Sequence, residues 1–227
     1  EPECCPMPHR VKIAAVSAGH RHTAFLLQTG ELLTAGVGTH GRLGHGDTAP
    51  RNAPAKVTAL TGKFVAAISA GGAHTAAVLE SGGIMLWGKG GKGQQGNARF
   101  QDQLIPSIVH VTHDRLPSVR VACGADHTLV ITAAGSGYSL GHKAPAAPRF
   151  VAVDFPVRGQ VTPRVVDIAA GGAHSVAVLV DGDTYAWGDN TSGQLGQGDF
   201  ELRELPVLLR FAAPPVGREG SVRLNPS

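Results

Sequence analysis

The stretch "AAGGAHSVAVLVDGDTYAWGDNTSGQLGQGDFELRELP", residues 169–206, decides the fold because its pattern recurs along the chain. Three other segments align with its first half without gaps: "SAGHRHTAFLLQTGELLTAG" (17–36), "SAGGAHTAAVLESGGIMLWG" (69–88) and "ACGADHTLVITAAGSGYSLG" (122–141). Self-similarity at a period of about 50 residues predicts a repeat architecture. The chain therefore contains four copies of one structural unit.

The copies share histidines and glycines at fixed offsets. The repeat histidines are 52, 53 and 47 residues apart, and a glycine follows each of them after eight residues. Units one, two and four continue with a glycine-rich loop and a proline, which unit three lacks. The repeat positions are His22, His74, His127 and His174; Gly30, Gly82, Gly135 and Gly182; and Pro54, Pro106 and Pro206.

Each unit is predicted to form a small antiparallel sheet. The second strand begins at the repeat histidine and is apolar on both faces, which predicts a buried central strand. Two-residue turns at Gly30 and its equivalents, with positive φ, lead to the third strand. In units one, two and four a fourth strand is expected to start at the repeat proline, where no ladder N–H is lost. The first strands are expected at Val11–Val16, Phe64–Ile68, Val119–Ala122 and Val165–Ala169.

Four short strands in every ~50 residues predict a β-propeller blade, so the fold class is all-β. Gly19, Gly71, Gly124 and Gly171 are expected to permit close approach of chains near the crowded axis. The chain divides into a proline-rich lead-in (1–10), four repeats (approximately 11–60, 61–115, 116–162 and 163–211) and a tail or start of a further repeat (212–227).

One glycine-rich loop imitates a phosphate-binding motif. "GIMLWGKG", residues 83–90, spells most of GxxxxGK, but Gly90 stands where a P-loop needs Ser or Thr to hold magnesium. The equivalent loops, "AGVGTHGRLG" and "WGDNTSGQLG", keep the glycines and not the lysines. The loop is therefore interpreted as structural.

No residues are predicted to hold a metal or cofactor or to catalyse a reaction. The repeat histidines occur once per unit and cannot converge on one ion unless they line the axis, and His20, His40 and His45 are expected at the loop surface. The "DGD" at 181–183 lacks the further oxygen ligands that calcium needs. The sequence also shows no nucleophile elbow and no paired carboxylates, so we predict that the chain is not an enzyme.

Composition limits the classes of partner. The chain has a net charge of +3 with 16% charged residues and no basic cluster, so nucleic-acid binding is not supported. Cys4, Cys5 and Cys123 do not form a disulfide framework, and no apolar run is long enough for a membrane span. We expect an intracellular protein, cytoplasmic (including the cytoskeleton) rather than nuclear.

The pattern AGxxH[ST]…DGxxxxWGxNxxGQLG…P resembles the repeat of the regulator of chromosome condensation family over residues 11–211. The resemblance implies a propeller with seven blades in a ring and repeat histidines that form internal hydrogen bonds. Trp87 and Trp187 are predicted to pack between adjacent blades; units one and three carry Ala35 and Leu140 instead.

The family includes exchange factors for Ran-type GTPases, a plant ultraviolet photoreceptor, domains of ubiquitin ligases and scaffold proteins. "GHRHT" has His20 where the photoreceptor motif has tryptophan, so light sensing is not supported. We predict a non-catalytic protein–protein interaction scaffold. The alternative is a guanine-nucleotide exchange factor with a small GTPase as partner, although the regular spacing leaves no room for a wedge-like insertion between these repeats.

Four units at a seven-fold pitch cover little more than half a ring. An open arc leaves two apolar blade faces in water, which favours association. We therefore expect residues 1–227 to be part of a longer propeller or to be closed by another chain, so that the protein works as one piece of an assembly.

Overall fold

A computed structural model describes residues 12–96, 100–111, 117–141, 150–157 and 163–211. These residues form four antiparallel sheets of four strands each, and each sheet is one blade. The predicted all-β propeller fold is confirmed. The predicted lead-in at 1–10, with Cys4 and Cys5, and the tail at 212–227 lie outside the described residues.

The strands run in chain order from the inner to the outer edge of each blade. The first blade contains β1 (Ile13–Ala18), β2 (His22–Leu27), β3 (Leu32–Gly36) and β4 (Arg51–Lys56), and the second β5 (Val65–Ala70), β6 (His74–Leu79), β7 (Ile84–Gly88) and β8 (Gln103–Val109). The third contains β9 (Ser118–Cys123), β10 (His127–Thr132), β11 (Gly137–Gly141) and β12 (Val151–Ala152), and the fourth β13 (Val165–Ala170), β14 (His174–Leu179), β15 (Thr184–Gly188) and β16 (Arg203–Leu208).

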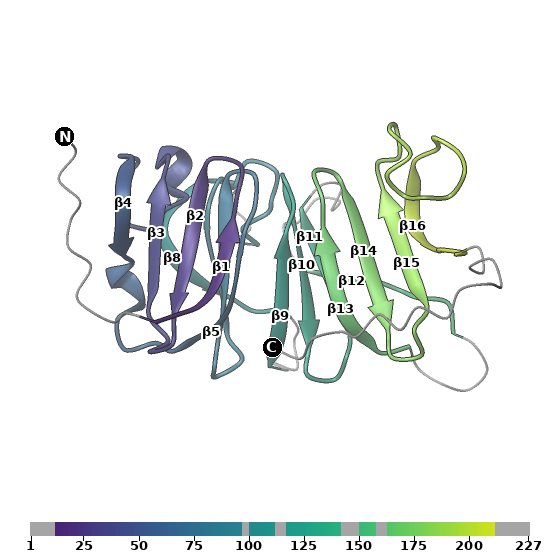
Figure 1. Cartoon of the computed structure of the whole chain (residues 1–227), viewed down its shortest axis with the longest axis horizontal. Helices are drawn as coiled ribbons and strands as arrows, with labels where there is room; N and C mark the ends of the chain where they lie inside the picture. The colour runs from purple at the N-terminus through teal and green to yellow at the C-terminus, as the bar shows by residue number, and fades with distance from the viewer. Residues whose placement is uncertain (1–11, 97–99, 112–116, 142–149, 158–162, 212–227) are drawn as a thin grey trace, which may run out of the picture.

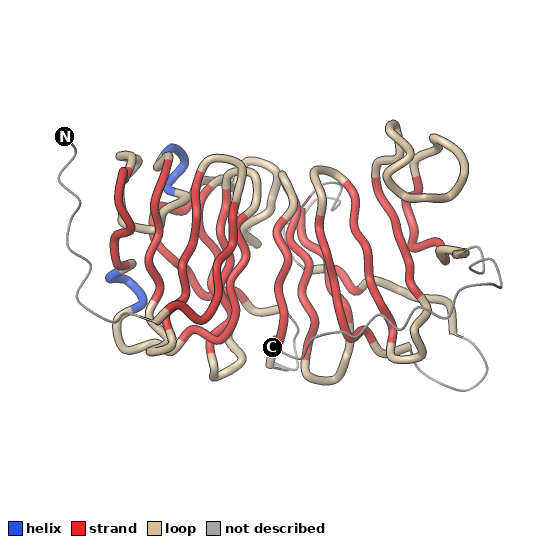
Figure 2. The backbone as a smooth tube through the Cα atoms, in the orientation of Figure 1, coloured by secondary structure: helices blue, strands red, loops and turns tan. Residues whose placement is uncertain are grey.

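The blades stand side by side, with the first at one end of the molecule and the fourth at the other (Figure 1). Neighbouring blades touch through their first strands, in the order β1, β5, β9 and β13. Strands and connecting turns make up nearly all of the described chain; the helical segments in Figure 2 are two short 3-10 turns, η1 (Thr39–Gly41) and η2 (Thr58–Leu60). No helix in the described ranges has the length and apolar character to cross a membrane.

The burial of the second strand of each blade shows whether the blade has a neighbour on one face or on both. β6 and β10 are buried along their whole length, because each lies between two other blades. In β2 and β14 buried and half-buried residues alternate, with opposite phase: Thr23 and Phe25 are half-buried in β2, whereas His174 and Val176 are half-buried in β14. Successive strand residues point to opposite faces. Among the described residues, the first and fourth blades therefore each leave one face uncovered.

The hairpin between the second and third strands differs from the predicted two-residue turn. Gly30 N–H donates to the carbonyl of Leu27, and Leu27 N–H donates to that of Glu31, which encloses three loop residues. The other blades repeat this pattern. A three-residue hairpin ends with a residue in the left-handed region. The predicted positive φ is confirmed at Gly30, Gly82, Gly135 and Gly182, which have φ between 78° and 87°.

The predicted positions of the outer strands are wrong by a few residues. Pro54 lies inside β4 and not at its start, and part of the expected strand forms η2 instead. Proline is tolerated there because the pairing of β3 with β4 is irregular between Thr34 and Gly36, and β4 is an edge strand. Pro106 and Pro206 lie within β8 and β16 in the same way. The sequence predicted no fourth strand for unit three, where the structure has the two-residue β12.

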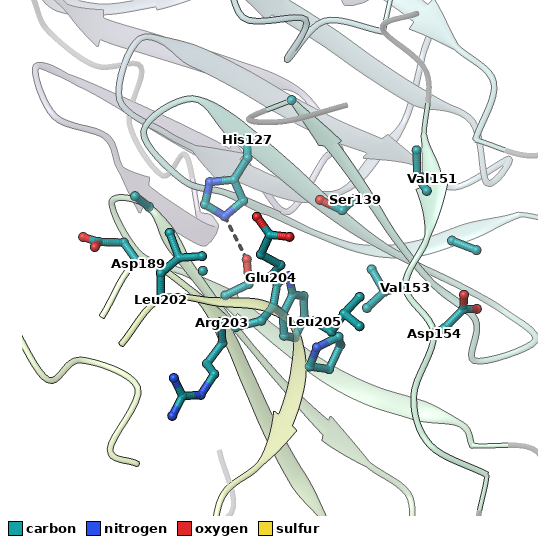
Figure 3. A pocket seen from close by; sticks show the side chains of 17 residues that line it. His127, Ser139, Val151, Val153, Asp154, Asp189, Leu202, Arg203, Glu204 and Leu205 are labelled. Atoms are coloured by element: carbon teal, nitrogen blue, oxygen red, sulfur yellow. Dashed lines mark hydrogen bonds between the residues drawn. The ribbon is translucent and has the colours of Figure 1, made fainter. Parts of the chain in front are cut away.

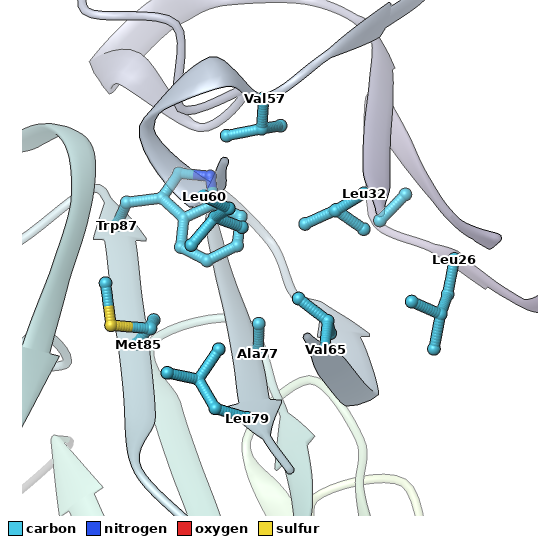
Figure 4. Close-up of a cluster of buried hydrophobic side chains, with 10 residues drawn as sticks. Leu26, Leu32, Val57, Leu60, Val65, Ala77, Leu79, Met85 and Trp87 are labelled. Carbon is cyan, nitrogen blue, oxygen red and sulfur yellow. The ribbon is translucent and has the colours of Figure 1, made fainter. Parts of the chain in front are cut away.

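A cluster of ten buried apolar residues fills the space between the first two blades (Figure 4). Trp87 of the second blade is fully buried there with residues such as Leu32 and Leu60 of the first unit. Blade-to-blade contacts, and not a single central core, therefore supply the hydrophobic stabilisation.

Candidate functional site

The repeat histidines form a series of hydrogen bonds that join each blade to the next. His22 Nε2 lies 2.8 Å from Thr75 Oγ1, His74 Nε2 lies 3.0 Å from Thr128 Oγ1, and His127 Nε2 lies 3.1 Å from Ser175 Oγ. Each partner is the residue that follows the next repeat histidine. The sequence predicted a structural role for the histidines but not these hydroxyl partners, although the recurring His-Thr or His-Ser pair was a signal for them.

The hydrogen bonds around His22 and His74 indicate which ring nitrogen carries the hydrogen. Thr75 Oγ1 donates its only hydrogen to the carbonyl of Arg42 (2.7 Å), so it accepts the hydrogen bond from His22 Nε2–H. Thr128 Oγ1 is likewise placed to donate to the carbonyl of Gln94 (3.4 Å). The Nδ1 atoms of His22 and His74 are buried and have no hydrogen-bond partner within the described part of the chain. Each ring therefore serves as a single N–H donor.

Burial keeps these two rings uncharged. Desolvation lowers the pKa of His74 to about 3, and the nearby His127 and His22 add to the effect. Desolvation, with a smaller contribution from the Arg42 guanidinium, lowers the pKa of His22 to about 4. A neutral imidazole is a possible metal ligand, but the described residues contain no group of three or more His, Cys, Asp or Glu side chains that could hold an ion.

The glycine three residues before each histidine has a steric reason. A Cβ on Gly71 would lie 2.4 Å from the carbonyl oxygen of Gly124 in the next blade and 2.8 Å from Cε1 of His74. A Cβ on Gly19 would lie 2.5 Å from Gly71 O and from Cε1 of His22. Contacts this short are not possible for a real Cβ, so only glycine lets the ring and the neighbouring backbone share this space.

The loop histidines that the sequence placed at the surface differ from one another. His20 and His40 are exposed, and His40 Nδ1 lies 2.7 Å from the carboxylate of Asp102 in the second blade. His45 is half-buried and lies 3.0 Å from Thr34 Oγ1. Desolvation, followed by the charge of Arg51, lowers the pKa of His45 below its ordinary value. His40 and His45 thus help to hold the first glycine-rich loop.

The glycine-rich loop of one blade covers the tryptophan position of the next. A Cβ on Gly44 would lie 2.8 Å from Nε1 of Trp87, and a Cβ on Gly41 would lie 2.5 Å from Cα of Leu104. Both glycines have positive φ. Loop backbone therefore lies directly against the next blade. This contact explains the spacing of the loop glycines without any phosphate.

The two tryptophans consequently have different environments. Trp87 is completely buried. Trp187 is only half-buried and meets Phe155 of the third unit at 6.0 Å between ring centroids. The difference arises between the third and fourth blades, where the sequence of unit three has no glycine-rich loop. A cavity of about 370 Å³ lies there, lined by residues of both blades (Figure 3).

The described residues thus offer three surfaces for a partner: the uncovered face of the first blade, the uncovered face of the fourth blade, and the cavity between the third and fourth. The repeat positions themselves are internal. Ala35 and Leu140, which replace tryptophan in units one and three, lie in β3 and β11, and Leu140 is fully buried.

Comparison with family profiles identifies the repeat. The profile "Regulator of chromosome condensation (RCC1) repeat" matches residues 29–78, 81–131 and 181–216, which together make up more than half of the chain. A second profile of the same repeat matches residues 65–94 and 165–194.

Curated relatives are much longer than this chain. It is 31% identical to the ultraviolet-B receptor UVR8 of Arabidopsis thaliana, over 91% of this chain and 49% of that protein. It is 28% identical to the E3 ubiquitin-protein ligase HERC2 of Homo sapiens, over 88% of this chain and 5% of that protein. Protein RCC2 of Homo sapiens is 27% identical over 90% of this chain and 46% of its own length. The chain spans about half the length of these relatives, or much less.

Solved structures show the same fold. Human WBSCR16 superimposes with a TM-score of 0.80 at 24% identity, covering 88% of this chain and 53% of that protein. Prp20p of Saccharomyces cerevisiae superimposes with a TM-score of 0.72 at 23% identity, covering 91% of this chain and 52% of that one.

Proposed function

Because the chain belongs to the regulator of chromosome condensation (RCC1) repeat family, we propose that it acts as a non-catalytic protein-interaction propeller within a larger assembly. One observation carries the proposal: the first and fourth blades each present an uncovered face with the chemistry of a blade-to-blade contact. We further propose that the protein works inside the cell, in the cytoplasm (including the cytoskeleton) rather than the nucleus.

The face of the fourth blade carries donors and apolar groups that interior blades bury. His174 stands where His22 and His74 donate to the next blade, and no hydrogen bond from its ring is found among the described residues. Val176 and Val178 continue the half-buried row along β14. The apolar row of β14, with the His174 ring as an N–H donor beside it, is complementary to an apolar surface that carries a hydroxyl acceptor.

The face of the first blade offers the complementary chemistry. Thr23 follows His22 as Thr75 follows His74, so its hydroxyl stands where interior blades accept a histidine N–H. Val16 in β1 is 65% exposed, in the strand that meets a neighbouring blade elsewhere in the fold. Each end of the arc therefore fits a blade-type surface, either from the same polypeptide or from another chain.

The names of the relatives do not transfer an activity. The ligases in the comparison share only a small part of their length with this chain, 5% for HERC2. No catalytic constellation supports chemistry on a substrate in the described residues, and a rigid repeat frame with variable loops is suited to recognition.

The alternative is guanine-nucleotide exchange on a Ran-like small GTPase. The yeast neighbour is described by its binding to Gsp1p and histones, but its 23% identity establishes the fold alone. A nucleotide-release assay with a panel of small GTPases separates the two functions. Catalytic acceleration of release by this chain would replace the scaffold proposal with the exchange proposal.

The scaffold proposal is tested by the mass of the chain in solution, measured by sedimentation over a range of concentrations. We expect concentration-dependent association, which Thr23→Arg on one face and Val176→Asp on the other should each prevent. Ile108→Asp is the matched control, because Ile108 is 58% exposed on the outer strand β8 of an interior blade. A stable monomer with a cooperative melt would show that the uncovered faces need no partner and would refute the proposal.

A further inference from the structure

The cavity between the third and fourth blades has an equivalent elsewhere in the chain, on the second blade, where a loop fills the space. Its lining includes Ser139, Val151 and Val153 from the third blade and Ser175, Trp187 and Leu205 from the fourth (Figure 3). Its volume of about 370 Å³ lies within the range of sites that hold ligands.

The fourth-blade wall corresponds, residue for residue, to a covered surface on the second blade. The equivalents lie 100 residues earlier in the sequence: Thr75 for Ser175, Trp87 for Trp187, and Ile105 and Pro106 for Leu205 and Pro206. On the second blade this surface is covered by the first glycine-rich loop, residues 37–46, through contacts of η1 with β7 and β8. The covered surface on the second blade therefore indicates what kind of segment the equivalent surface on the fourth blade can bind.

Two hydroxyl groups hold the backbone of that loop. Thr75 Oγ1 of the second blade donates to the carbonyl of Arg42 (2.7 Å), and Thr34 Oγ1 of the first blade donates to the carbonyl of Leu43 (2.8 Å). The loop thus offers two consecutive carbonyls, one to each blade. Gly44, the next residue, lies against Nε1 of Trp87, where a Cβ would approach to 2.8 Å.

The open cavity keeps both hydroxyl positions. Ser175 stands in the place of Thr75. Ser139 stands in the place of Thr34, because Ser139 lies twelve residues after His127 and Thr34 lies twelve residues after His22. Ser175 is 4% exposed and its Oγ lies 3.1 Å from His127 Nε2, but no carbonyl accepts from it or from Ser139 among the described residues. The two hydroxyl donors, one on each wall, therefore suit a single segment of main chain that lies between the walls.

We propose that this cavity binds a glycine-containing turn supplied by a partner protein, a proposal that rests on the interaction function above. Two consecutive carbonyls of the turn accept hydrogen bonds from Ser139 and Ser175, and the glycine that follows lies against the indole of Trp187. The exposed side chains of Val151 and Leu205 cover the apolar part of the turn.

The sequence of unit three lacks the glycines of the first glycine-rich loop. The loop in the first unit depends on Gly41 and Gly44, both with positive φ. The segment that follows Gly141, "HKAPAAPR" at 142–149, contains no glycine. A residue other than glycine takes that conformation at a cost, so the glycine-containing turn is proposed to come from a partner.

The test uses a cyclic peptide of residues 38–46, "GTHGRLGHG", titrated into the full chain while tryptophan fluorescence is recorded. We expect a saturable change, which Trp187→Phe abolishes even though Trp87 remains. Ser139→Ala and Ser175→Ala should each weaken binding about fivefold, the loss expected for one hydrogen bond of about 1 kcal/mol. Thr29→Ala, at an exposed turn in the first blade, is the control and should bind as the parent does.

A peptide that carries Gly44→Val should not bind, because its Cβ would meet the indole. The proposal is overturned if no saturable change occurs, or if the double variant Ser139→Ala/Ser175→Ala binds with the parent affinity. Binding only after residues 142–149 are replaced by a Gly-Ser linker would identify the chain's own segment as the occupant and would also overturn it. The open-face variants Thr23→Arg and Val176→Asp test the assembly separately, so either proposal can fail without the other.

Discussion

Acidification should destabilise this propeller well before its carboxylates titrate. His22 and His74 are neutral when folded, with pKa values of about 4 and about 3, against 6.5 for an unperturbed histidine. A group whose pKa is lowered by folding contributes its stability above the unfolded pKa, and this is lost as the pH falls toward the folded value. Below pH 6.5 the unfolded chain therefore takes up protons that the folded chain refuses.

The size of the effect follows from the pKa shifts. Well below pH 6.5 each buried histidine lowers the unfolding free energy by about 1.4 kcal/mol per pH unit; because the unfolded ring is only half protonated at pH 6.5, the loss between pH 6.5 and pH 5 is about 1.6 kcal/mol. The two rings together account for about 3 kcal/mol, a large share of the stability of a typical domain. The lowered pKa of His45 acts in the same direction. The carboxyls of Asp47 and Asp199, with pKa values held below 3.8, lose their contribution only at lower pH.

Urea unfolding at about pH 7, 6 and 5 measures this loss. His74→Gln keeps a donor at the blade contact but cannot be protonated, so it should reduce the loss by about half, whatever its stability at neutral pH. Gln28→Ala, at an exposed position without a titratable group, is the control and should leave the pH dependence of the parent unchanged. Equal pH dependence in the parent and His74→Gln would refute the view that buried neutral histidines join the blades.

Three further predictions concern packing. Trp87→Ala should cost about 3–5 kcal/mol of unfolding free energy, because the indole is completely buried, whereas Trp187→Ala should cost less; equal losses in urea unfolding would contradict the structure. Gly71→Ala should lower the melting temperature because its Cβ would lie 2.4 Å from a backbone oxygen, while Gly91→Ala, with nothing within 4 Å, should not. His74→Ala should cost at least about 1–3 kcal/mol, since it removes the partner of buried Thr128, and purified protein should contain no stoichiometric zinc.

The sequence was sufficient for the architecture because the repeat encodes local geometry directly. Glycine eight residues after each histidine requires a turn with positive φ, and the apolar run before it requires a buried strand. Boundaries of the outer strands were predicted less well. Pro54 suggested a strand start, but an irregular edge strand tolerates proline inside the pairing, which no local signal revealed.

Contacts between blades were harder to predict than the blades, because they join residues about 50 positions apart. Each His-to-hydroxyl bond spans one repeat, as from His22 to Thr75. The sequence marked the hydroxyl only as a recurring Ser or Thr beside the histidine. Burial distinguishes the contacts further: β6 is buried on both faces and β14 on one, although their sequences "HTAAVL" and "HSVAVL" are nearly the same. The neighbour, and not the strand, decides which face is covered.

The places where the repeat is broken therefore carry the functional information. A repeat position that is filled in every unit serves the frame, as His74 and Gly71 do. A position whose partner is absent leaves the same chemistry available to another molecule. His174 without a following hydroxyl, Thr23 without a preceding histidine, and Ser175 without a loop carbonyl are three such cases among the described residues. These unmatched groups determine which surfaces can recognise a partner. Thr23 and His174 can be substituted without altering a contact between two of the described blades.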